Sequence, residues 1–276
     1  MLKNHPKGIM VMFTTEMWER FGFYIMMAIL VLYMDSEFGW TDSVKGDHYG
    51  AFLGLVYFIP LLGGYLGDKI FGQINTVIYG SVSMLFGYIA LALSSADQLL
   101  SFYLGLFLVA FGTGIFKVNM AVLVGNLYID KVHLKDAGFN IFYMGVNVGA
   151  TIAPLAATLL GYIFNDYRMS FWAAALGMVI CIITFYLGKN KLLKADVKQS
   201  DKSEKKIVFE EIPQKEVVER IITLGILFTI VIFFWMAFYQ NGFALTLFAE
   251  RSTKIYDFLR PETYQFFNPF FILILT

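Results

Sequence analysis

Long apolar runs separated by short polar stretches dominate the pattern of this sequence. A helix needs about 20 apolar residues to cross a bilayer. Runs of this kind occur at 9–34, 48–70, 75–95, 99–128, 137–164, 169–188 and 218–249, and an eighth begins near residue 262. The runs do not alternate every second residue, as the strands of a membrane β-barrel do. The pattern therefore predicts an all-α protein that crosses the membrane several times.

The composition agrees with this prediction. Hydrophobic residues make up 58% of the chain and charged residues 15%, against roughly 45–50% and 25% in soluble domains. The formal net charge is zero, so nothing indicates a nucleic-acid partner. Cys181 is the only cysteine, which excludes a disulfide framework. The first apolar run is too long for a cleavable signal, so we expect it to remain as the first membrane helix.

The distribution of lysine and arginine predicts the orientation, because cytoplasmic loops carry an excess of both. With the N-terminus inside, the outer loops hold Lys45, Arg168, Arg251, Lys254 and Arg260. The inner segments hold about fourteen, namely Lys3, Lys7, Lys69, Lys131, Lys135 and nine between 189 and 220. We therefore expect a multi-pass protein of the cell inner (plasma) membrane with a cytoplasmic N-terminus.

One polar linker divides the chain. Lysine and glutamate dominate residues 189–217, and Ser200, Ser203 and Pro213 interrupt any helix there. Six helices, a basic linker and further helices follow the six-plus-six plan of a major facilitator transporter. The sequence thus predicts a six-helix bundle over 1–188, a cytoplasmic linker over 189–217 and the incomplete start of a second bundle over 218–276.

Three charged residues interrupt the first apolar run. Glu16, Glu19 and Arg20 share one helical face, and each costs at least ~2.5 kcal/mol in the bilayer centre. Glu16 and Arg20 can pair, but Glu19 has no second cation near it in sequence. A structural ion pair would leave that second carboxylate unexplained. A proton relay, the common role of carboxylates inside membranes, explains it better.

Two later runs hold further polar candidates. Lys117 is the other charge deep in a span, and local neutrality predicts that it faces the same cavity as the glutamates. Asn147 offers both a donor and an acceptor at membrane depth. It could bond to another helix or to a ligand, and both interpretations stay open. Tyr24 and Tyr57 fit ordinary core packing by default.

Several ordered motifs carry a resemblance to a known family. They are E-x-x-E-R-F at 16–21 followed by Tyr24, G-T-G-x-x-K at 112–117, F-Y-x-x-x-N-x-G at 142–149 and F-W-M-A-F-Y-Q at 234–240. The G-x-x-x-D motif that ends in Asp68 resembles the major facilitator signature, although Gln73 replaces its basic residue. From the first helix to residue 250, the sequence resembles the proton-coupled oligopeptide transporter (POT) family of that superfamily.

The resemblance implies a function and a role for each matching residue. It implies proton-driven symport of di- and tripeptides by alternating access, in the lipid bilayer, with protons as the coupling ion, no cofactor or metal, and no enzyme activity. The proton-coupling residues it implies are Glu16, Glu19, Arg20 and Lys117. The substrate contacts it implies are Tyr24, Tyr57, Lys117, Asn147, Trp235, Tyr239 and Gln240. Asp68 would act in the cytoplasmic gate.

The sequence also departs from the family. Tyr239 stands where members often have a glutamate near the peptide's amino end, and Val118 replaces a proline after Lys117. The linker has no room for the two extra helices that many bacterial members insert. A full member has about twelve helices, so we expect this chain to be a fragment that lacks the remainder of the second bundle.

Three alternatives remain beside this interpretation. A major facilitator transporter of another small solute is the nearest, and Tyr239 is its best support. A seven-helix receptor or retinal protein is a second, but a retinal pigment needs a lysine that 221–249 does not contain. An intramembrane enzyme is the third, and no paired aspartates, Ser/His pair or HExxH motif lies in a span.

Overall fold

The computed structural model describes residues 4–196, 214–254, 256 and 259–275, and these are almost entirely helical. The main helices are α1 (Ile9–Phe38), α2 (Asp42–Tyr65), α3 (Gln73–Ala92), α4 (Leu99–Leu127), α5 (Lys135–Phe164), α6 (Arg168–Gly188), α8 (Gln214–Phe238), α9 (Ala244–Ser252) and α10 (Phe267–Leu275). Shorter helical segments are η2 (Leu66–Phe71), η3 (Val132–Leu134), η4 (Lys189–Lys191), η5 (Tyr239–Gly242) and η6 (Pro261–Phe266).

Within the described residues, 7 helical stretches are long and apolar enough to cross a membrane. This confirms the predicted all-α membrane fold. The predicted start of the second helix at 48 was late, because α2 already begins at Asp42. Of the predicted linker 189–217, residues 197–213 lie outside the described residues.

The predicted continuous helix over 218–249 was wrong in its detail. α8 ends at Phe238, η5 follows in a tighter helical form, and α9 begins only at Ala244. Asn241 and Gly242 stand at the break, and both residue types are poor helix formers. A Cβ atom on Gly242 would lie 2.3 Å from the Tyr49 hydroxyl, so the break also allows α2 and η5 to approach closely.

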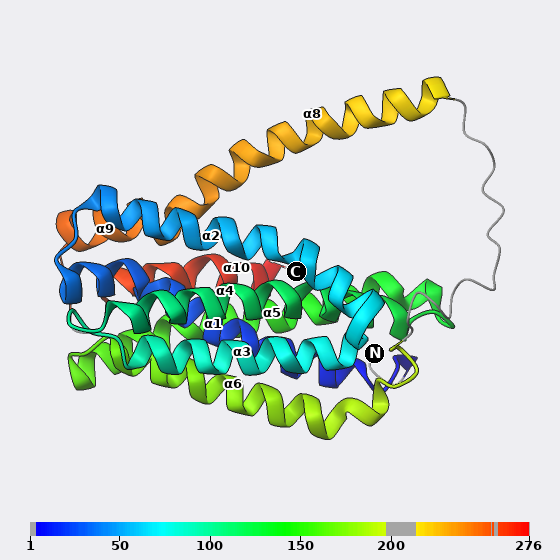
Figure 1. The fold of residues 1–276 in the computed structure, drawn as a ribbon, viewed down its shortest axis with the longest axis horizontal. Coiled ribbons are helices and arrows are strands. Elements are labelled where there is room, and N and C mark those ends of the chain that lie inside the picture. Colours follow the sequence, from blue (N-terminus) through cyan, green and yellow to red (C-terminus); the bar gives the residue numbers. More distant parts are fainter. Residues whose placement is uncertain (1–3, 197–213, 255, 257–258, 276) are drawn as a thin grey trace.

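α1 is the central helix of the first six (Figure 1). It packs against α5 and α6, while α3 packs against α4 and α6, and α2 packs against α4. Glycines allow these close approaches, as is common between membrane helices. A Cβ atom on Gly112 of α4 would lie 2.5 Å from the Gly80 carbonyl oxygen of α3. One on Gly149 of α5 would lie 2.3 Å from the Met17 carbonyl oxygen of α1. The charged face of α1 is therefore held inside the bundle.

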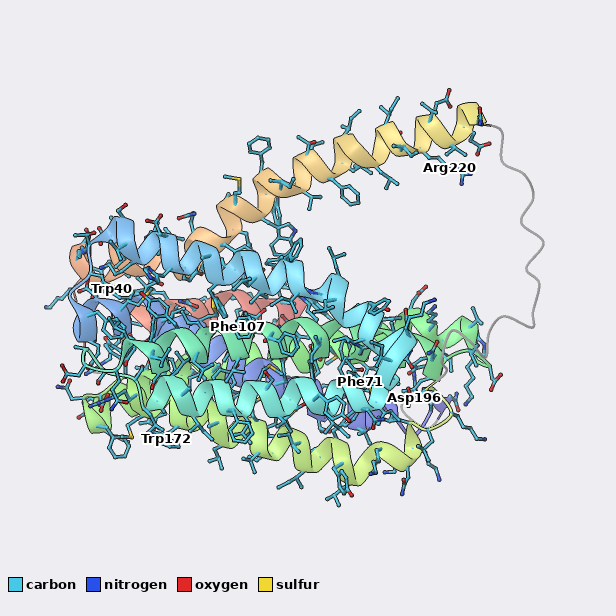
Figure 2. All side chains as sticks on the ribbon, viewed as in Figure 1. Trp40, Phe71, Phe107, Trp172, Asp196 and Arg220 are labelled. Carbon is cyan, nitrogen blue, oxygen red and sulfur yellow. The ribbon has the colours of Figure 1, made fainter. Side chains whose placement is uncertain are left out.

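After residue 213, α8 meets the six-helix bundle at one end only, whereas η6 and α10 pack against α5. Figure 1 shows α8 leaving the others near the start of α2 and diverging from them along its length, so that Arg220 lies far from the bundle in Figure 2. At the near end Arg251 of α9 donates two hydrogen bonds to Asp42 of α2, at 2.6 and 2.7 Å. The buried Lys45 also contacts Asp42, at 3.0 Å. Arg251 also lies 4.0 Å from Asp35 of α1, so these charges join α9 to the first two helices.

At the opposite end, Asp196 ties the chain after α6 to the start of α3 (Figure 2). Its Oδ1 accepts hydrogen bonds from the backbone N–H groups of Gln73 at 2.8 Å and Ile74 at 3.3 Å. The first N–H groups of a helix have no partner within the helix, so a side-chain acceptor stabilises them.

We therefore expect Asp196→Ala to lower the free energy of unfolding by about 1 kcal/mol. Thermal unfolding of the purified protein in detergent measures this change. Asp130→Ala, which removes an exposed carboxylate, is the matched control. Equal effects of the two substitutions would contradict the capping role.

Candidate functional site

A cavity of about 480 Å³ lies between the first bundle and the later segments. Pockets for small organic ligands fall between about 300 and 1,000 Å³. α1, α2, α4 and α5 form one wall, and α8, η5, η6 and α10 form the other. Its polar lining is Glu16, Arg20, Tyr24, Tyr57, Thr113, Lys117, Tyr143, Asn147, Trp235, Tyr239, Asn241, Gln265 and Asn268. The cavity thus suits a small polar ligand.

Arg20 holds the two carboxylates of α1 together. Its Nε lies 3.2 Å from Glu16 Oε1, and its Nη2 donates to Glu19 Oε1 at 2.8 Å. All three side chains are nearly or wholly buried. Glu16 lines the cavity, whereas Glu19 lies behind Arg20 and does not. Glu16 Oε2 has no hydrogen-bond partner among the described residues. The cluster therefore presents one carboxylate edge to the cavity and encloses the other.

Lys117 enters the same cavity from α4. Its Nζ lies over the Tyr57 ring, 5.9 Å from the centroid. It forms no ion pair with any carboxylate in the part of the chain that the structure describes. An ammonium group in this position can bind a carboxylate or another anion through charge-assisted hydrogen bonds.

Two tyrosines join the walls of the cavity. The hydroxyl groups of Tyr57 on α2 and Tyr239 on η5 contact each other. Trp235 stacks on Tyr239 with ring centroids 5.5 Å apart. Tyr49 donates to the Tyr239 carbonyl oxygen at 3.4 Å. Tyr239 is thus fixed against α2, and its ring faces the cavity. A glutamate at this position would place a negative charge there, whereas the phenol places none.

The remaining candidates divide between the cavity and the bundle. Tyr24 and Asn147 line the cavity, and Asn147 Nδ2 donates to the Tyr143 carbonyl oxygen at 2.9 Å within α5. The Asn147 side-chain oxygen thus remains available as an acceptor. Gln240 is exposed, lies outside the cavity lining and donates to the Met236 carbonyl oxygen at 3.4 Å. Asp68 lies in η2, directly after α2, and outside the cavity lining.

Asp68 accepts a hydrogen bond from Gln73 Nε2 at 3.1 Å. A neutral amide therefore occupies the place of the basic residue in the major facilitator signature. The bond spans η2 and the first turn of α3, at the end of the bundle where Asp196 lies (Figure 2). Asp68 is thus part of the α2–α3 turn and stands apart from the cavity.

Sequence reasoning missed five polar residues of the lining, namely Thr113, Tyr143, Asn241, Gln265 and Asn268. Gln265 and Asn268 are three positions apart and so share a helical face, a signal that the sequence did contain. It also missed Asn119, which is buried and donates to the Gly63 carbonyl oxygen at 2.9 Å. This bond joins α4 to α2 beside the cavity.

The fold and the site define a class of protein. A multi-pass helical membrane protein with a ligand-sized, charged cavity between two groups of helices has the architecture of a secondary transporter. Solved structures support this. The chain is similar to a crystal structure of a peptide transporter POT in complex with sulfate, with a TM-score of 0.79, 28% identity, and coverage of 100% of this chain and 68% of that one. A mutant of a peptide transporter POT bound to alafosfalin matches with a TM-score of 0.79 and 29% identity.

Sequence comparisons point the same way. The family model described as "POT family" matches residues 74–206. The uncharacterized transporter YclF of Bacillus subtilis (strain 168) is 40% identical over 195 residues, which are 69% of this chain and 39% of that protein. A di-/tripeptide transporter of Lactococcus lactis subsp. lactis (strain IL1403) is 36% identical over 196 residues, 67% of this chain and 38% of that protein. The chain spans about two fifths of the length of these curated relatives. Over residues 74–206 the chain matches the POT family, and the relatives and solved structures that it resembles are transporters and not enzymes.

Proposed function

We propose that this chain is part of a proton-coupled symporter of di- and tripeptides that works by alternating access. The observation that carries the proposal is Lys117, which has no ion-pair partner among the described residues and shares the cavity with the Glu16–Arg20 pair. The similarity to a di-/tripeptide transporter of Lactococcus lactis supports the substrate class. Protons are the proposed coupling ion, and no cofactor or metal is part of the proposal.

The cavity residues can each serve one part of a zwitterionic peptide. Lys117 would bind the peptide's carboxylate, because a buried charge needs an opposite charge and hydrogen bonds. Tyr24, Tyr57 and Asn147 would bind its amide groups. Trp235 and Tyr239 would contact its amino-terminal side from the other wall, and Gln240 would reach it only after a rearrangement. Asp68 would act in the inner gate.

Proton coupling would use the carboxylates of α1. Protonation of Glu16 or Glu19 would weaken its bond to Arg20 and change the net charge of the cavity. Lys117 would then be free to alternate between a carboxylate of the cluster and the peptide. The excess of lysine and arginine in the inner segments supports a cytoplasmic N-terminus in the cell inner membrane.

The direct test is uptake of a labelled dipeptide into vesicles that contain the full-length protein. Concentrative uptake should appear when the outside is acidic and disappear when a protonophore removes the gradient. Empty vesicles and a single amino acid are the controls. Uptake that does not depend on the pH gradient would contradict proton coupling. No dipeptide uptake at all would favour the alternative, a major facilitator transporter of another small solute.

Tyr239 leads to a prediction about how the peptide is recognised. A phenol carries no charge at neutral pH because its pKa is about 10. It can offer an acceptor and a cation–π face worth roughly 0.5–2 kcal/mol. Lys117 retains a full charge. We therefore expect the peptide's carboxylate to matter more than its amine.

Competition against labelled dipeptide uptake measures this difference. A C-terminally amidated dipeptide should compete at least about tenfold less well than its N-acetyl counterpart, a difference of about 1.4 kcal/mol. The unmodified dipeptide is the control. An N-acetyl group that weakens competition as much as the amide would show that another residue supplies the missing carboxylate.

A further inference from the structure

Glu262 is a buried carboxylate that the proposed transport site does not use. It lies in η6, outside the seven candidate membrane spans and outside the lining of the cavity. Its residue is 0% exposed. Neither of its carboxylate oxygens has a hydrogen-bond partner among the described residues, and no described cation forms an ion pair with it. An ionised carboxylate in such a place is strongly disfavoured.

Glu262 lies where the later part of the chain packs against α5. The Thr158 hydroxyl of α5 and the Thr263 hydroxyl of η6 are 2.8 Å apart. Glu262 Oε1 lies 3.6 Å from the point where a Cβ atom on Gly161 of α5 would stand. The carboxyl group is therefore buried by contact between η6 and α5, and separation of the two would return it to water.

The charged and titratable groups around η6 do not neutralise Glu262. Arg260, two positions earlier, places Nη1 3.0 Å from the same Cβ point of Gly161 but forms no ion pair with Glu262. Glu250 of α9 also has a buried carboxylate oxygen, Oε2, without a hydrogen-bond partner among the described residues. Arg251 of α9 and Lys45 of α2 are bound to Asp35 of α1 and Asp42 of α2. α10 has no titratable residue, and the nearest at this end of α5 is the exposed Tyr162.

The balance of these groups favours the neutral acid. Burial raises the pKa of Glu262 above its ordinary value; its own backbone N–H and Arg260 act to lower the pKa, and Glu250 acts to raise it. Tyr167, in the turn between α5 and α6, responds in the same way, because burial and then the nearby Glu262 raise the pKa of its phenol. Among the described residues, no group of three or more His, Cys, Asp or Glu could hold a metal ion.

We propose that Glu262 is a second proton-binding site, separate from the cluster on α1. It binds a proton when η6 packs against α5 and releases the proton to water when η6 leaves α5. The proposed orientation places this end of the bundle outside. Acidic conditions would then favour the state in which η6 and α5 are packed, and alkaline conditions would favour their separation. This proposal rests on the alternating access proposed above and adds a pH-dependent contact to it.

Infrared spectroscopy of the full-length protein in lipid nanodiscs tests the proton itself. The wild type should have a carbonyl band of protonated carboxylic acid at neutral pH, and Glu262→Gln should lose the Glu262 component of it, whatever the α1 carboxylates contribute. Asp97→Asn, which neutralises an exposed carboxylate at the same end, should retain it. Glu262→Asp should retain a band at a shifted frequency. A band that Glu262→Gln leaves unchanged would overturn the proposal. This readout needs no transport, so failed dipeptide uptake would leave it intact.

A distance measurement tests the coupling to packing. Spin labels at Tyr162 of α5 and Tyr264 of η6, both exposed, report the separation of these two elements after Cys181 and any cysteine outside residues 1–276 are replaced by alanine. In the wild type the short-distance population should grow as the pH falls. Glu262→Gln should hold that population high at every pH, and Asp97→Asn should behave as the wild type. A pH response that survives Glu262→Gln, or one that sodium reproduces at fixed pH, would overturn the proposal.

Discussion

Replacing Glu16 or Glu19 by glutamine is expected to abolish concentrative dipeptide uptake. Glutamine has nearly the shape of a protonated glutamate but cannot release a proton. Glu16 presents an oxygen without a described partner at the cavity, and Glu19 is wholly buried against Arg20. If their protonation drives the cycle, each variant should reach at most the external concentration of peptide, whatever the pH gradient.

Counterflow separates coupling from binding in these variants. Exchange of labelled for unlabelled peptide needs no net proton movement, so it should survive in at least one of them. Glu219→Gln removes an exposed carboxylate of α8 and should accumulate peptide normally. Normal gradient-driven uptake by both Glu16→Gln and Glu19→Gln would end the proposal that these carboxylates carry the proton.

Removal of Arg20 is expected to have the largest effect on stability. Arg20 is 4% exposed and contacts both Glu16 and Glu19. Arg20→Leu leaves two buried carboxylates without a cation, and loss of one partner of a buried ion pair typically costs about 3–5 kcal/mol. Reversible unfolding of the purified protein in detergent should therefore show a fall of about this size.

Two further variants identify the cause of that fall. Arg168→Leu removes an arginine whose side chain is 40% exposed in its pair with Asp166, and pairs of this kind are worth about 0–1 kcal/mol. A triple variant that adds Glu16→Gln and Glu19→Gln to Arg20→Leu removes the uncompensated charges and should recover much of the loss. A loss no larger than that of Arg168→Leu would mean that the carboxylates are neutral without Arg20.

Much of the fold was predictable because its signals are local. A bilayer requires long apolar helices, and the lengths of the runs follow from that requirement. The placement of Glu16, Arg20 and Lys117 around one cavity was also predictable, because charges inside a membrane face the protein interior. The roles of these residues in transport remain predictions.

Other features depend on contacts between distant parts of the chain. Glu262 follows Pro261 at the start of a helix, where an acidic residue is usually solvated and favourable. Its burial arises from the packing of η6 on α5 and on the neighbouring helices α1, α9 and α10. The break after Phe238 has weak local signals, and the approach of Tyr49 to Gly242 completes it. Asn119 is an ordinary helix residue until α2 supplies the Gly63 carbonyl oxygen.

The break between α8 and α9 allows α8 to pivot about η5 as one rigid helix. α8 has 25 residues and is therefore about 37 Å long. Pivoting it at η5 by roughly 10° would displace its far end by about 6 Å, from the same length. Tyr239 stands at this pivot, held by Tyr49 and Tyr57 of α2. A ligand that moves the Tyr57–Tyr239 contact by a fraction of an ångström would thus act at η5. A small displacement there becomes a larger one at the far end of α8.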